Sequence, residues 1–224
     1  MRERFLSFFV IGVLTVMVFI FFFIQTQPIS APKLASVSTD ATAQKIPIVT
    51  FVNPSKGSTH PKLTLVEYSD FACPACKQLN PVLDIALQTY PNDIRIVWKN
   101  MPNDSTHPQA IIAAVAAHCA DRQGKFWEYS EALFNRQSYL SNTTFTQIAT
   151  DLSLNQDKFS KCLLSKDTLP IITKDFEEGQ SLGIVATPAL FVGDELVVGL
   201  QTADELTRTI AKQLQKAQPY APSK

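Results

Sequence analysis

The sequence predicts an α/β domain that carries an inserted helical block and follows one N-terminal transmembrane helix. Three observations support this prediction. A β-rich run, a helical segment and a second β-rich run follow one another between residues 63 and 99. The stretch 109–182 then has helical patterns and no convincing strand, whereas β-rich runs return at 189–198. An uncharged apolar run near the N-terminus precedes all of these elements.

The apolar run extends from Phe5 to Ile24 and follows two basic residues, Arg2 and Arg4. At about 1.5 Å per helical residue, its twenty residues cover roughly the 30 Å hydrocarbon core of a bilayer. Signal peptides usually have a shorter apolar core of about 7–15 residues before a small-residue cleavage site, and 25–31 offers only a poor site. We therefore expect an uncleaved, single-pass anchor in a bacterial cytoplasmic (inner) membrane, with a removed signal peptide as the alternative. Basic residues on the short N-terminal side place the rest of the chain in the periplasm or another extracytoplasmic space.

Length and charge limit the remaining possibilities. The 224 residues, 46% of them apolar, suffice for one sizeable domain with an appendage. Twenty basic residues balance twenty acidic ones, so no nucleic-acid partner is expected. The predicted division is a cytoplasmic N-terminus and anchor (1–24), a flexible linker rich in Ser, Thr, Pro and Gln (25–45), the α/β domain (46–216, with the helical insertion at about 105–182) and a C-terminal tail (217–224).

The elements of the domain follow from periodicity and turn residues. A strand at 63–68, a helix ending near Thr89 and a strand at 94–99 form a right-handed βαβ unit with parallel strands. The stretch 46–52 is β-like and is predicted as an edge strand or as part of the linker. The insertion and the C-terminal part then comprise helices at 109–121, 125–134, 144–152, 156–164 and about 166–179, a hairpin turning at Gly193-Asp194, and a last helix at 203–215.

The most informative motif is Cys73-Pro74-Ala75-Cys76, between the first strand of the βαβ unit and its helix. Unpaired N–H groups and the helix dipole stabilise a thiolate at a helix N-terminus, and Pro74 suits the first helical position. Two intervening residues let one helical turn bring the sulfurs together, which favours a reversible disulfide. A CxxC pair is also half of a zinc site, so a metal-binding or chaperone-like module is the alternative. We find no strong third ligand, and no metal or cofactor is predicted; His60 and His107, in loop-like stretches, are expected to be solvated.

These residues resemble the thioredoxin superfamily, and within it the DsbA-like branch with a helical insertion. The resemblance covers about residues 48–215 and depends on the CxxC after a strand, Pro81 five residues beyond it, the helical block, and Thr187-Pro188 before the hairpin. Two local phrases, Glu67 to Phe71 and Gly124 to Glu128, are also similar to the branch. The resemblance implies a thioredoxin fold.

The resemblance also implies roles for individual residues. Cys73 would be the nucleophile and Cys76 the resolving cysteine. Pro188 would be cis and lie against the CxxC, with the hydroxyl of Thr187 facing the Cys73 sulfur. Glu67 would be a buried carboxylate that relays protons to and from Cys76, and the alternative is a solvated glutamate at a strand end.

Two cysteines remain, Cys119 and Cys162, both in the insertion. Four cysteines allow three pairings, and if Cys73 and Cys76 exchange electrons the other two are left for one another. DsbA-like proteins with a second pair in this block are familiar, so the resemblance favours a structural disulfide. Two buried free thiols or a second redox centre are the alternatives.

The expected function is that of a membrane-anchored thiol:disulfide oxidoreductase that oxidises thiols of exported proteins. Its partners would be the thiols or disulfides of exported proteins, and a membrane redox partner that recycles the CxxC. Pro74-Ala75 departs from the Pro-His dipeptide typical of the strongest oxidants. A disulfide reductase or isomerase is therefore the close alternative.

Overall fold

The structure is a computed structural model that describes residue 17 and residues 46–217. Apart from Met17, the predicted anchor and linker lie outside the described residues, as does the predicted tail beyond residue 217. Within the described part of the chain, no helix is long and apolar enough to cross a membrane.

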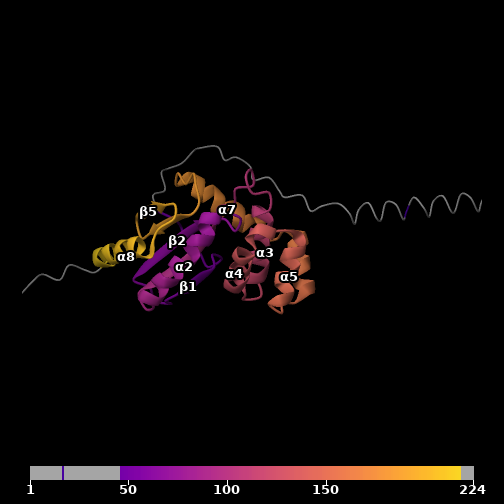
Figure 1. Cartoon of the computed structure of the whole chain (residues 1–224), viewed down its shortest axis with the longest axis horizontal. Coiled ribbons are helices and arrows are strands. Elements are labelled where there is room, and N and C mark those ends of the chain that lie inside the picture. Colours follow the sequence, from indigo (N-terminus) through magenta and orange to yellow (C-terminus); the bar gives the residue numbers. More distant parts are fainter. Residues whose placement is uncertain (1–16, 18–45, 218–224) are drawn as a thin grey trace, which may run out of the picture. The chain divides into compact units, whose positions relative to one another are not determined.

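A five-stranded mixed sheet forms the centre of the domain (Figure 1), with strand order β1-β3-β2-β4-β5. Strands β2 (Leu63–Ser69) and β3 (Ile94–Asn100) are parallel and flank helix α2 (Pro74–Thr89), which confirms the predicted βαβ unit. Strands β4 (Ala189–Val192) and β5 (Glu195–Val198) form the predicted antiparallel hairpin, and β4 pairs antiparallel with β2. The CxxC motif therefore follows a central strand.

Alternating side chains of the sheet build two cores. On one face, leucine and isoleucine side chains of β2 and β3 form one core cluster with side chains of α2 and of α8 (Ala203–Ala217); Leu65, Leu83 and Ile210 all belong to it. On the other face, a smaller cluster that includes Val66 and Tyr68 packs with residues of α7 (Leu169–Ser181) and the segment after it. The sheet is covered on both sides, as its continuous apolar strands require.

The helical insertion lies beside the sheet (Figure 1) and consists of α3, α4, a 3₁₀ turn, α5, α6 and α7. Every residue of α3 from Ala110 to Ala120 is buried, because this helix is apolar on all sides and packs against its neighbours. The helix bounds are α3 (Ala110–Asp121), α4 (Phe126–Asn135), η1 (Gln137–Tyr139), α5 (Asn142–Asp151) and α6 (Gln156–Ser165).

The structure corrects the prediction of an edge strand within 46–52, which contains no strand. Pro47 has no N–H to donate, and the N–H of Ile48 donates to Glu178 Oε1 at 2.7 Å instead of to a neighbouring strand. The edge strand is β1 (Ser55–Gly57), antiparallel to β3. Gly57 has a φ of +106°, and a Cβ there would meet the carbonyl oxygen of Ile94 at 2.7 Å, so the close pairing requires glycine.

A disulfide between Cys119 and Cys162 joins α3 to α6, with the Cα atoms 5.7 Å apart. It spans 43 residues of sequence. Because it closes a loop of this length, replacing both cysteines with alanine should destabilise the domain by up to about 4 kcal/mol in the chain-entropy model. Urea unfolding of the chain and of the double variant measures this loss. Equal midpoints would mean that the disulfide does not stabilise the domain by restricting the unfolded chain, as the chain-entropy model assumes.

Candidate active site

The CxxC pair lies at the start of α2, where a central strand passes into a helix. Cys73 is the N-cap residue, with an extended backbone (φ −83°, ψ 120°), and Pro74 begins the helix. Both thiols are free and buried, but Cys76 is fully enclosed whereas Cys73 is 7% exposed. A reacting sulfur from another molecule can therefore approach Cys73 and not Cys76.

The two thiols have opposite pKa shifts. The pKa of Cys73 is lowered to about 5, chiefly by a hydrogen bond from the Cys76 side chain, while burial opposes the shift. The Thr187 side chain and the backbone N–H groups of Cys76 and Ala75 lower it further. The pKa of Cys76 is raised by burial and by the adjacent Cys73 sulfur. At neutral pH the pair therefore holds a Cys73 thiolate beside a Cys76 thiol.

The loop before β4 closes over this pair. The Thr187–Pro188 peptide bond is cis, and the carbonyl oxygen of Thr187 lies 3.5 Å from Cys73 Sγ, where it accepts a hydrogen bond from the protonated thiol. The structure thus brings Cys73, Cys76, Thr187 and Pro188 together. The resemblance implied a contact from the Thr187 hydroxyl. A hydrogen bond from the Thr187 side chain does lower the pKa of Cys73, and the backbone carbonyl of the same residue is a second contact.

Glu67 lies on β2, on the same side of the strand as Leu63 and Leu65, and is only 2% exposed. The alternative of a solvated glutamate at the strand end is therefore wrong. Burial raises the pKa of Glu67 to about 7, partly offset by Ser69 and Lys56. Its Oε1 atom has no hydrogen-bond partner within the described residues. A buried carboxyl that titrates near neutral pH can both donate and accept a proton.

Replacing Glu67 with glutamine should make the protein more stable at alkaline pH. Between pH 4.5 and about 7 the unfolded state loses a proton that the folded state keeps, so stability of the chain falls as the pH rises through this window. Above pH 7 the cost of the buried carboxylate is about 3 kcal/mol, from a shift at 1.36 kcal/mol per pKa unit. We expect Glu67→Gln to gain about this amount at pH 8 and little at pH 4 in urea unfolding. An equal gain at both pH values would show that the carboxyl does not titrate in this range.

Sequence analysis missed Asp70 and Gln137, which both hold the backbone just before the CxxC motif. Asp70 is buried and accepts hydrogen bonds from the N–H of Ala72 (2.8 Å), the N–H of Asn103 (3.1 Å) and His107 Nδ1 (2.8 Å). The expectation that His107 is solvated is wrong, because its ring is 27% exposed and pairs with Asp70. Asp70 therefore ties the segment before the CxxC to the loop after β3. No local pattern could reveal a partner 37 positions away.

Gln137 ties the helical insertion to the same segment. Its Nε2 atom donates to the carbonyl oxygens of Phe71 at 2.8 Å and Cys73 at 2.9 Å. These two carbonyls flank Ala72, directly before α2. The insertion therefore fixes the backbone that presents the reactive sulfur.

Comparison with known proteins agrees with this geometry. A family model described as Thioredoxin matches residues 52–212. The chain belongs to the thioredoxin family. The prediction of a thioredoxin-superfamily oxidoreductase is thereby confirmed, and the anchor that was predicted with it is not shown.

Proteins similar to this thioredoxin-family chain include solved thioredoxin-like structures and curated antiporter sequences. A periplasmic thioredoxin-like protein from Salmonella enterica serovar Typhimurium is 28% identical, with a TM-score of 0.62 over 73% of this chain and 91% of that one. The catalytic domain of Proteus mirabilis ScsC is 26% identical, with a TM-score of 0.65 over 73% and 90%. A Na(+)/H(+) antiporter NhaA 1 from Mycolicibacterium vanbaalenii is 32% identical over 157 residues, which are 69% of this chain and 25% of the antiporter. The chain thus spans about a quarter of the length of the curated relatives it matches.

Proposed function

We propose that the chain is an extracytoplasmic thiol:disulfide oxidoreductase that oxidises thiols of exported proteins through a Cys73–Cys76 disulfide. The observation that carries this proposal is the position of Cys73 at the N-cap of α2 beside the fully enclosed Cys76. This position lowers the pKa of Cys73 to about 5, whereas the pKa of Cys76 is raised. A stabilised thiolate favours the reduced pair over the disulfide. The disulfide of such a pair is an oxidant, because its reduced form is stabilised.

In the proposed reaction, a substrate thiolate attacks Cys73 Sγ of the oxidised pair. The Cys73–Cys76 bond breaks, a mixed disulfide forms between substrate and Cys73, and Cys76 leaves and takes up a proton. Protonated Glu67 is the donor of that proton, since its pKa of about 7 leaves a large protonated fraction at neutral pH. A second substrate thiolate then attacks the substrate sulfur, so that the substrate gains a disulfide and Cys73 leaves as a thiolate.

The two electrons taken from the substrate now reside on the reduced CxxC pair. A membrane redox partner of the chain accepts them and restores the disulfide, with Glu67 taking back the proton of Cys76. The carbonyl oxygen of Thr187 lies 3.5 Å from Cys73 Sγ and the cis Pro188 follows it, so in this proposal the two residues line the path of the substrate. In this proposal residues 5–24 anchor the chain, single-pass, in a bacterial inner membrane, and residues 46–216 act on its outer side. The likeness to a periplasmic thioredoxin-like protein supports that location.

The decisive test is the equilibrium of the Cys73–Cys76 pair in glutathione buffers, with the Cys73 thiolate followed by absorbance in the same samples. A potential near the oxidising end of the range of about −270 to −120 mV, with an acidic thiolate, is expected. A potential near the thioredoxin end would replace the oxidase with a disulfide reductase or isomerase acting at the same site. Failure of the two cysteines to form a disulfide would overturn both functions.

A further inference from the structure

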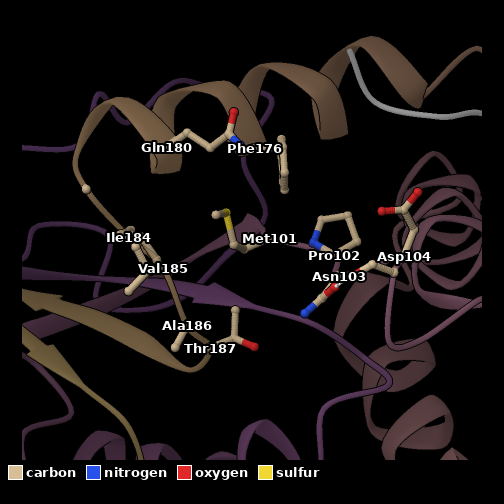
Figure 2. Close-up of a pocket in the computed structure, with 12 residues that line it drawn as sticks. Met101, Pro102, Asn103, Asp104, Phe176, Gln180, Ile184, Val185, Ala186 and Thr187 are labelled. Atoms are coloured by element: carbon tan, nitrogen blue, oxygen red, sulfur yellow. Dashed lines mark hydrogen bonds between the residues drawn. The ribbon is translucent and has the colours of Figure 1, made fainter. Parts of the chain in front are cut away.

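Two cavities of similar volume open at different places on the described domain. One, of about 510 Å³, is lined by the loop after β3, the end of α7 and the segment that leads to Thr187 (Figure 2). Because Thr187 contacts Cys73, that cavity belongs to the CxxC site. The other, of about 440 Å³, lies on the helical insertion, and both cysteines of the disulfide between α3 and α6 line it. We call it the disulfide pocket, and its lining includes Cys119, Arg122, Lys158, Lys161, Cys162 and Asp167.

The two cysteines of this disulfide differ in accessibility, as the two cysteines of the CxxC motif do. Cys162 is 6% exposed, close to the 7% of Cys73, whereas Cys119 is only 1% exposed and Cys76 is fully enclosed. A thiolate that enters the disulfide pocket can therefore reach Cys162, and Cys119 is the cysteine that leaves. Disulfides that solvent reaches are the more labile ones. The pocket volume also lies within the range of about 300–1,000 Å³ that small ligands occupy.

Positive charge dominates the lining of the disulfide pocket. Arg122, Lys158 and Lys161 are exposed basic residues, and Asp167 is the one acidic residue in the lining. Asp167 is already paired with Arg122, since its Oδ2 atom lies 3.2 Å from Nη1 of the arginine. Within the described residues neither lysine has an ion-pair partner. An anion in the pocket therefore meets two cations that no paired carboxylate neutralises.

Each cysteine also has a cation about one helical turn away on its own helix. Arg122, the C-cap residue of α3, follows Cys119 by three positions, and Lys158 precedes Cys162 by four positions on α6. Residues three or four positions apart are neighbours on the surface of a helix. The C-terminal end of α3 disfavours negative charge on Cys119, and Arg122 opposes that effect. Since nearby cations stabilise thiolates, either cysteine can leave when the disulfide is attacked.

We propose that the Cys119–Cys162 disulfide is a second thiol–disulfide exchange site, whose pocket binds low-molecular-weight thiols that carry a carboxylate. The thiolate of such a molecule attacks Cys162 Sγ, the bond to Cys119 breaks, and Cys119 leaves as a thiolate that takes a proton from water. A second small thiolate then attacks the small-molecule sulfur of the mixed disulfide, and Cys162 leaves. Two electrons thus pass from two small thiols, which become a disulfide, to the Cys119–Cys162 pair. This site goes beyond the function proposed above, because neither Cys73 nor Cys76 takes part.

The exchange has a consequence for the whole domain, because the disulfide joins two helices of the insertion. Reducing it removes a constraint on the unfolded chain, which lowers the stability of the folded one. The residue before Cys119 is the buried His118, whose Nε2 atom lies 2.8 Å from Asn100 Nδ2 at the end of β3. The site therefore couples the stability of the domain to the ratio of small thiols to small disulfides in its surroundings.

The test uses the full chain in detergent as the Cys73→Ser/Cys76→Ser variant, which retains only Cys119 and Cys162 of the four cysteines. Its disulfide is reduced at pH 8 and low salt by 3-mercaptopropionate, 2-mercaptoethanol or cysteamine, which carry a carboxylate, no charge and an ammonium group. Acid quenching, alkylation and mass spectrometry give each rate, which is divided by the rate of the same thiol with an uncharged disulfide peptide. This division removes the intrinsic reactivity of each thiol.

The normalised rate with 3-mercaptopropionate should be about tenfold higher than with cysteamine, which corresponds to about 1.4 kcal/mol. The rate with 2-mercaptoethanol should lie between them. The difference should shrink in 1 M salt, where the Debye length is only about 3 Å. Peptide mapping of samples quenched early should place the 3-mercaptopropionate adduct on Cys162.

Two charge variants in the same background separate the pocket from the net charge of the chain. Lys158→Gln/Lys161→Gln should bring the ratio between 3-mercaptopropionate and cysteamine close to one. Lys77→Gln/Lys174→Gln is the matched control, because it also removes two exposed lysines, on α2 and α7, that do not line the disulfide pocket. This control should keep the ratio of about ten.

Four results would each overturn the exchange site. They are a ratio near one before any lysine is replaced, a faster normalised reaction with cysteamine, an adduct on Cys119, and an unchanged ratio in Lys158→Gln/Lys161→Gln. A rate that does not rise with thiol concentration would overturn it as well, since only the unfolded chain would then react. Because the variant lacks Cys73 and Cys76, none of these results bears on the function proposed for the CxxC motif.

Discussion

Replacing Cys73 with serine is expected to reduce disulfide exchange to the uncatalysed rate, whereas replacing Cys76 with serine should trap substrates. Cys73 is the accessible sulfur and the stabilised thiolate, so without it no mixed disulfide forms. Without Cys76, a mixed disulfide on Cys73 has no internal thiol to resolve it. Non-reducing electrophoresis and mass spectrometry of the chain after reaction with a disulfide-bonded peptide would detect the adduct in Cys76→Ser and none in Cys73→Ser.

The double variant Cys119→Ala/Cys162→Ala is the control for these experiments. Both of its replaced cysteines are bound to one another, on α3 and α6 of the insertion, so it should retain exchange activity at temperatures where it is folded. If Cys73→Ser forms the adduct and Cys76→Ser does not, the two roles are reversed. The order of reactivity would then not follow from burial.

The parts of this site that the sequence predicts are those with local causes. A strand followed by Cys73-Pro74 fixes the helix N-terminus within a few residues, and Gly193-Asp194 fixes the tight turn of the hairpin. The alternation of β2 places Glu67 on a buried side, because Leu63 and Leu65 share that side. By contrast, the cis bond before Pro188 was an implication of the family resemblance, since the residues alone allow an ordinary trans proline.

The parts that the sequence does not predict depend on partners far along the chain. The edge strand β1 forms at 55–57 because β3, about forty residues later, offers an open edge there. Asp70, directly after β2, pairs with His107 in the segment after β3. Gln137, in the insertion, donates to the backbone next to the CxxC motif. The cavity beside Thr187 has the same origin, since three separate segments line it. Tertiary packing created each of these features.

A buried charge cluster joins β3 to α7. Lys99 Nζ lies 3.0 Å from Asp175 Oδ1 and 2.8 Å from Glu178 Oε2, and the Lys99 and Asp175 side chains are at most 3% exposed. Asn53 and Asn100 also donate hydrogen bonds to Asp175. Burial raises the pKa of Asp175, and Lys99 partly offsets the shift. The lysine therefore favours the charged form of a carboxylate that burial disfavours.

Lys99→Met should destabilise the domain by about 3–5 kcal/mol at pH 8, because it leaves buried carboxylates without their cation. The pKa of Asp175 then rises further, so the unfolded state loses a proton that the folded variant keeps. Stability of the variant consequently falls as the pH rises, and the loss at pH 5 should be smaller than at pH 8. Adding Asp175→Asn removes the unpaired charge and should recover part of the stability. Urea unfolding at both pH values measures each effect.

Lys62→Met provides the matched control for this prediction. Lys62 pairs with Asp93 at 2.7 Å, but its side chain is 64% exposed, and such surface pairs contribute only about 0–1 kcal/mol. A loss in Lys99→Met as small as that in Lys62→Met would mean that the buried cluster contributes no more than a surface pair. Met101 lies directly after β3, two residues beyond Lys99, and Phe176 adjoins Asp175 on α7. Since both residues line the cavity beside Thr187, the cluster that stabilises the fold also holds two walls of that cavity together.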